Sequence, residues 1–168
     1  MTLLLRPFTS EDRAEAFAAQ REVAGENFDF LWGYDVEGTW DDYVRTLEDL
    51  ARGRRVPEGL VPSATLVGDV AGQLVGRVSV RFELNEFLAT RGGHVGYCVR
   101  PQFRRRGYAT QMLAMAVDML RDRGVERVLV TCDDDNVASA GVIERCGGQL
   151  ESTLDIEGDR FRRYWITT

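Results

Sequence analysis

The sequence of 168 residues contains no lysine, so all 21 of its basic residues are arginines. This absence excludes enzymes that form a Schiff base through a lysine, which include pyridoxal-phosphate enzymes and lysine aldolases. It also excludes the P-loop, in which a lysine contacts the bound phosphates.

Histidine and cysteine are scarce as well. His94 is the only histidine, and the three cysteines are Cys98, Cys132 and Cys146. Their odd number lacks the paired spacing of a zinc site or a disulfide framework, so we expect no metal and a reducing compartment. No apolar run approaches the length of a membrane span, and the run Leu3–Leu5 is too short for a secretory signal. The sequence therefore predicts a cytoplasmic protein without a membrane partner.

The net charge of −6 argues against a general nucleic-acid-binding protein, because such domains are usually basic. An acidic surface fits a cationic substrate, although acidity also serves solubility alone. The apolar content of 44% and the charged content of 29% are ordinary for a globular domain. The length predicts a single domain over residues 1–168.

Hydrophobic periodicity and turn residues predict an α/β protein with a mixed sheet, in the order β-α-α-β-β-β-α-β-α-β-β. Residues 84–93 are expected to form a connector. The predicted strands are 2–8, 64–70, 73–82, 94–101, 126–132 and a terminal hairpin that turns near residues 157–158, and the predicted helices are 10–22, 39–51, 108–123 and 136–148.

The stretch 99–113 holds the consecutive residues Arg104 to Arg106, followed by Gly107 and the start of a helix. The arginines could form a nucleic-acid patch, a solvated charge run or the rim of a phosphate-binding turn. At a strand–turn–helix junction, the free N–H groups of the first helical turn point outward and favour an anion. Gly107 and Ala109 keep the backbone accessible, and the guanidinium groups attract phosphate. The pattern predicts a phosphate site, without the G-x-G-x-x-G run of dinucleotide-binding proteins.

The segment "VRPQFRRRGYAT" resembles the acetyl-CoA pyrophosphate loop of the GNAT N-acyltransferase superfamily, whose motif is Q/R-x-x-G-x-G/A. "NVASAGVIERCGG" resembles the family's N-x-x-A/S helix. "GGHVGYCVRP", "CDDDNVAS" and "RYWI" are similar to a branch of predicted bacterial acetyltransferases, which shares motifs with ribosomal-protein-alanine acetyltransferases. The resemblance covers nearly the whole chain and implies the GNAT fold.

The resemblance further implies acetyl-CoA as co-substrate and direct acetyl transfer to a primary amine of a small molecule or a protein N-terminus. It implies that the edge at Cys98 and Val99 pairs with the pantetheine and places the acetyl carbonyl, and that Asn136 and Ser139 contact the pantetheine arm or the thiol. The oligomeric state is open, and a homodimer is the commonest assembly. The cofactor-binding loop implied by the resemblance comprises Arg104, Arg105, Arg106, Gly107, Tyr108, Ala109 and Thr110.

Three positions depart from the family pattern. Arg105 stands where many members have a second glycine, and any residue there still supplies an amide. Ile143 stands where many members have a tyrosine that protonates the leaving thiolate. Gly148 replaces the usual phenylalanine. The second departure removes the tyrosine acid common in the family.

Attack by an amine requires loss of a proton, so a group that accepts this proton is expected in the site. His94 lies on the fourth strand and titrates near neutral pH, and Glu83 is near the end of the third. A chain of water molecules without a dedicated base is a further alternative. Ser139 is the candidate hydrogen-bond donor to the thiolate, or else a capping serine. An N–H group of the fourth strand is expected to meet the oxyanion.

Other features have two interpretations each. Cys132 is a nucleophile or a buried strand residue, and residues 133–135 are a metal site or a solvated loop. A catalytically silent CoA-binding sensor and a nucleic-acid-binding protein are the alternative functions. The aromatic residues that line an acceptor pocket or the core are Phe28, Phe30, Trp32 and Tyr34.

Overall fold

A computed structural model describes residues 2–168 and shows one seven-stranded sheet in the order β1-β2-β3-β4-β5-β7-β6. The strands are β1 (Leu3–Pro7), β2 (Ser63–Val70), β3 (Gln73–Arg81), β4 (Val95–Val99), β5 (Arg127–Asp133), β6 (Gln149–Ile156) and β7 (Asp159–Thr167). The α-helices are α1 (Arg13–Glu22), α2 (Trp40–Ala51), α3 (Glu86–Thr90), α4 (Tyr108–Arg121) and α5 (Val137–Arg145).

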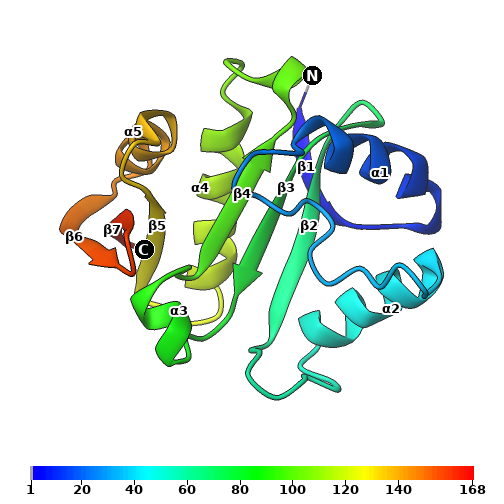
Figure 1. The fold of residues 1–168 in the computed structure, drawn as a ribbon, viewed down its shortest axis with the longest axis horizontal. Helices are drawn as coiled ribbons and strands as arrows, with labels where there is room; N and C mark the ends of the chain where they lie inside the picture. The colour runs from blue at the N-terminus through cyan, green and yellow to red at the C-terminus, as the bar shows by residue number, and fades with distance from the viewer. Residues whose placement is uncertain (1) are drawn as a thin grey trace.

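The two faces of the sheet are covered by different helices. Figure 1 shows α4 behind the central strands, α1 and α2 at the right, and their connection crossing in front of β3 and β4. Leu113, Ala116 and Leu120 of α4 pack against Val78 and Val80 of β3 in the larger core cluster. The cluster on the opposite face joins residues of α1 and α2 to the sheet. Within residues 2–168, no helix is long and apolar enough to cross a membrane.

The predicted mixed sheet and element order are confirmed, with one α-helix in addition. The connector expected over residues 84–93 contains α3. Asn85 starts this helix, because its side-chain oxygen accepts a hydrogen bond from the N–H of Leu88 at 2.9 Å. A helix of five residues is too short to show a helical period in the sequence.

The end of α5 explains the glycine at position 148. Gly147 has a φ of +86°, and the N–H of Gly148 donates to the C=O of Ile143 at 2.9 Å, which closes the helix in a Schellman motif. A Cβ atom added to Gly148 would clash with Cγ2 of Ile143. The same Cβ atom would also lie 2.8 Å from the C=O of Ile143, so the close approach of the backbone by itself requires glycine at 148.

Candidate active site

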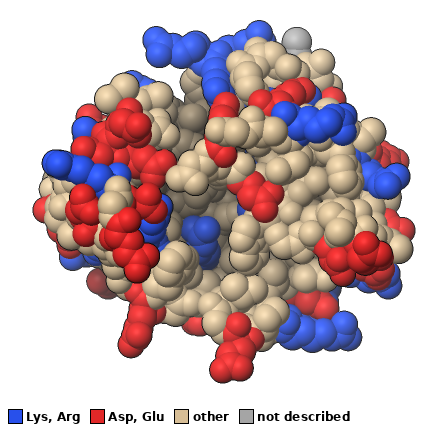
Figure 2. Space-filling model, viewed as in Figure 1, with Lys and Arg blue, Asp and Glu red and all other residues tan. Residues whose placement is uncertain are grey.

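A cleft opens where β4 and β5 separate. The two parallel strands share one ladder pair, Val95 with Val130, next to the hydrogen bond from the N–H of His94 to the C=O of Leu129 at 2.7 Å. Beyond this pair β5 continues its ladder with β7, so the β4 edge from Gly96 onward has no ladder partner on β5. Figure 2 looks onto the face that the connection between α1 and α2 crosses. It shows a hollow there with a basic side chain at its floor.

The loop after β4 presents a run of free backbone amides. Arg105 and Gly107 adopt left-handed conformations with φ of +63° and +80°. Within residues 2–168, the N–H groups from Arg105 to Thr110 have no hydrogen-bond partner, and the first helical donor is the N–H of Gln111. Six consecutive free amides at a helix N-terminus form a concave site for an anion.

The arginine side chains around this loop are largely engaged elsewhere. Arg104 donates from Nε to the C=O of Val99 at 2.9 Å and pairs through Nη2 with Glu26 at 2.7 Å. The buried Arg100 pairs with Glu22 at 2.7 Å, and Arg106 donates to a backbone carbonyl. The loop therefore offers its backbone to a ligand more directly than its Arg104 side chain.

A pair of hydroxyl groups connects β4 with α5. Asn136 begins α5, with its Oδ1 accepting from the N–H of Ser139 at 3.0 Å. The Oγ of Ser139 lies 2.8 Å from the hydroxyl of Tyr97, whose pKa is raised by burial. Ile143 is fully buried and offers no polar group. Tyr97 was not singled out from the sequence, although the motif "HVGYCVRP" contains it.

The structure gives His94 a structural contact. Its side chain is 6% exposed, and Nδ1 accepts a hydrogen bond from the N–H of Leu129 at 2.9 Å. Burial, together with the nearby charge of Arg81, lowers the pKa of His94 to about 4. The ring is neutral at pH 7, and the lone pair that a base needs is already occupied. A general base at His94 stays a prediction, with geometry that favours a structural role. Glu83 is exposed in the bend after β3.

The cysteines near the cleft are poor nucleophiles. Cys98 and Cys132 are buried, and burial raises the pKa of each thiol to about 11. At neutral pH both thiols are therefore protonated, which favours the structural interpretation of Cys132. In the neighbouring loop, Asp134 pairs with Arg160 at 3.0 Å and with Arg162 at 2.7 Å.

The aromatic residues between α1 and α2 divide between core and cleft. Phe30 is fully buried, and Tyr34 packs edge-on against Phe17 with ring centroids 5.1 Å apart. Phe28 is half-buried, with its ring 5.2 Å from the guanidinium carbon of Arg77. Trp32 is 46% exposed. Phe28 is thus the one of the four that contacts a polar group on the cleft face of β3.

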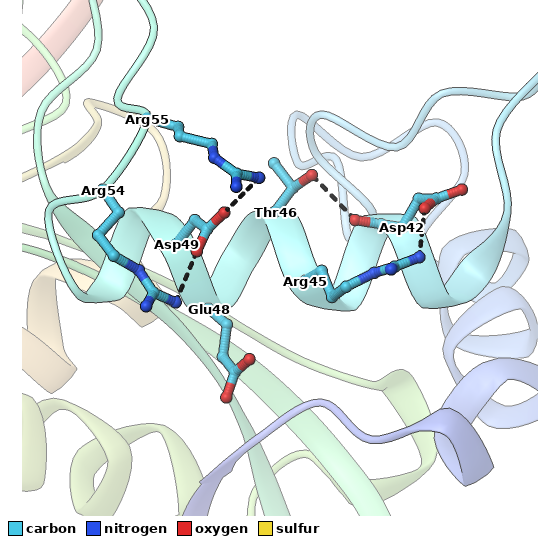
Figure 3. Close-up of a pocket in the computed structure, with 7 residues that line it drawn as sticks. All are labelled: Asp42, Arg45, Thr46, Glu48, Asp49, Arg54 and Arg55. Carbon is cyan, nitrogen blue, oxygen red and sulfur yellow. Dashed lines mark hydrogen bonds and ion pairs between the residues drawn. The ribbon is translucent and has the colours of Figure 1, made fainter.

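Two surface depressions lie elsewhere. One of about 450 Å³ lies along α2, where Arg45 pairs with Asp42 and Arg54 and Arg55 pair with Asp49 (Figure 3). Because its charged groups form ion pairs with one another, this depression gives no indication of a bound ligand. The other, of about 510 Å³, lies beside Trp40.

The comparisons with known proteins agree with this geometry. The family described as "Acetyltransferase (GNAT) domain" matches residues 2–149. The chain belongs to the GNAT acetyltransferase family. This confirms the resemblance read from the sequence and makes the protein an N-acetyltransferase by family.

The three individual relatives described next share at most 28% sequence identity with the chain. The chain is 28% identical to "Acetyltransferase YE1169" of Yersinia enterocolitica over 125 residues, which cover 74% of this chain and 80% of the relative. The RimJ structure from Mycobacterium smegmatis, described as a complex with CoA-disulfide, has a TM-score of 0.74 and 21% identity, covering 99% of this chain and 82% of that one. The ribosomal-protein-alanine N-acetyltransferase from Brucella melitensis has a TM-score of 0.70 and 22% identity, covering 98% and 99%.

Proposed function

We propose that this protein transfers the acetyl group of acetyl-CoA to a primary amine of a small molecule or a protein N-terminus by direct attack. The observation that supports this most strongly is the run of six free amides from Arg105 to Thr110, directly beside the gap between β4 and β5. The CoA compound named in the RimJ structure supports the same cofactor.

In this proposal the pyrophosphate lies against the loop amides at the N-terminus of α4. The pantetheine follows the unpaired edge of β4 at Cys98 and Val99, with Asn136 and Ser139 on the opposite side of the gap. A backbone N–H of β4 then faces the acetyl oxygen. Because such a donor is fixed by the sheet, it needs no rearrangement when negative charge develops on the oxygen.

The transfer forms a C–N bond and breaks a C–S bond. The neutral amine nitrogen attacks the thioester carbonyl, and the C–S bond breaks as the tetrahedral intermediate collapses to an amide. The nitrogen loses its proton to solvent, and the CoA thiolate takes up a proton. With Nδ1 of His94 occupied and Glu83 exposed, a water chain is the proton acceptor that we favour.

The thiolate meets the hydroxyl pair of Ser139 and Tyr97. The hydroxyl of Tyr97 lies 2.8 Å from Oγ of Ser139 and 3.3 Å from its C=O, so a Tyr97 O–H turned toward Oγ makes a donor chain from tyrosine to serine. Ser139 would then donate to the leaving sulfur in place of the tyrosine that Ile143 replaces.

A binding and turnover experiment tests the proposal. Calorimetry with acetyl-CoA is expected to show one saturable site, and a panel of amines is expected to release free CoA with formation of the acetylated amine by mass spectrometry. Absence of acetyl-CoA binding would refute the proposal. Tight binding without turnover on any amine would instead favour the CoA-binding sensor.

A further inference from the structure

Two arginines of β3 face the cleft without a carboxylate partner. Arg77 is 4% exposed and donates only to neutral groups, the C=O of Asp29 at 2.8 Å and Oγ of Ser79 at 2.6 Å. Its Nε is buried and has no hydrogen-bond partner within the described residues. Arg81 is half-buried and donates from Nη1 to the backbone carbonyls of residues 92–93, each at 3.2 Å. Neither forms an ion pair within residues 2–168.

The other buried arginine of the described residues is paired with an acid. Arg100 is buried to a similar degree and forms a two-point ion pair with Glu22. Asp29 accepts from Arg77 through its backbone C=O, while its carboxylate accepts from the N–H of Leu31. Burying a charge without an opposite charge is costly, so the two cations together leave a positive potential that a ligand can neutralise.

Arg81 lies beside the edge of β4 that borders the cleft. In the ladder of β3 and β4, Arg77 lies opposite Cys98 and Ser79 lies opposite Gly96. Gly96 has no side chain, and a Cβ atom there would lie 3.8 Å from both Nη atoms of Arg81. The guanidinium therefore lies over Gly96, at the point where β4 leaves β5. The hollow with a basic floor in Figure 2 opens on this face.

We propose that Arg81, with the charge of Arg77 behind it, binds an anionic group of the acceptor, so that the acceptor is a small amine carrying a carboxylate or a phosphate. This inference rests on the proposed acetyl transfer. Gly96 and Cys98 are two residues apart, or about 7 Å along a strand. That spacing accommodates one hydrogen bond to the anion plus the few bonds between the anion and the amine of an α- or β-amino acid.

Matched acceptors test the inference on the wild-type protein. Each α-amino acid of the panel is compared with its carboxamide, and each aminoalkylphosphonate with the corresponding alkylamine. The carboxamide has the more readily deprotonated amine, so it would be the better acceptor if the anion played no part. We expect kcat/KM to favour the carboxylate or phosphonate by about tenfold or more. Carboxamides, or a neutral amidated peptide, used equally well would overturn the proposal.

Three variants locate the effect. Arg81→Gln is expected to raise KM for the anionic acceptor by about tenfold or more while the carboxamide is unaffected. Arg81→Lys, which keeps the charge, is expected to retain part of the preference. The control, Arg45→Gln on the outer face of α2, removes an exposed arginine and should change neither value. Equal losses for both acceptors in Arg81→Gln would contradict the assignment.

Binding measurements distinguish a failure of the anion-site proposal from a failure of the proposed acetyl transfer. If Arg81→Gln does not fold, calorimetry on the wild-type protein saturated with CoA compares N-acetyl amino acids with N-acetyl amino amides. A preference for the acid supports the anion site, and equal affinities overturn it. Wild-type protein that does not bind acetyl-CoA would refute the acetyl transfer itself, whereas binding without acid preference would refute only the acceptor class.

Discussion

The loop after β4 and the strand β3 both bring arginines to the cleft, but they use them in opposite ways. In the loop, Arg104 is tied to Glu26, and the free groups are the backbone amides from Arg105 to Thr110. In β3, the backbone is used in the sheet, and within the described residues the side chains of Arg77 and Arg81 donate to neutral groups without an acidic partner. The partners that the fold gives each arginine therefore indicate an anion site better than a cluster of arginines in the sequence does.

The largest expected effect concerns the backbone side of this comparison. Gly107→Asp is expected to weaken acetyl-CoA binding at least a hundredfold, about 2.7 kcal/mol, because it places a carboxylate beside the loop amides. A Cβ atom at Gly107 would meet only Nε2 of Gln111, at 3.8 Å, so the fold itself loses about 1–2 kcal/mol through the left-handed φ. Calorimetry measures the affinity.

Gly124→Asp is the matched control. Gly124 follows the opposite end of α4 with a φ of +81° and nothing within 4 Å of its Cβ position, so this variant carries the same backbone strain and the same charge. It should bind acetyl-CoA like the wild type. Equal weakening in both variants would mean that general destabilisation, and not the loop, controls the affinity.

A separate effect, on stability and not on binding, concerns His94. The unfolded imidazole titrates near its ordinary pKa of about 6.5, whereas the folded one has a pKa of about 4. Between these values only the unfolded state binds the proton. The stability therefore falls as the pH drops through this window, by up to about 3 kcal/mol. His94→Asn, whose amide oxygen can replace Nδ1 as acceptor for Leu129, should lose this part of the pH dependence.

Urea unfolding between pH 4.5 and 7 measures the difference, and turnover is recorded in parallel. We expect His94→Asn to retain turnover to within about threefold and to show the flatter stability profile. Loss of turnover together with loss of an inflection in the pH–rate profile would instead establish His94 as the general base.

Much of the fold could be predicted because its signals are local. The spacing around Gly107 identified the loop, and hydrophobic periodicity with turn residues placed the strands and four of the helices in their order. The sequence could not show which arginines would be neutralised, because the partner of Arg104 is 78 residues away in the chain. The contact of His94 with Leu129 spans 35 residues, so its engaged nitrogen was equally hidden.

The most direct test is an amide NMR titration of the whole chain with CoA, with the arginine Nε–H signals followed in the same spectra. The backbone N–H signals of Arg105 to Thr110 are expected to shift strongly and to become protected from hydrogen exchange, while the Nε–H of Arg104 changes little. Shifts confined to the arginine side chains, with the six backbone amides unchanged, would contradict a cofactor site built from the backbone.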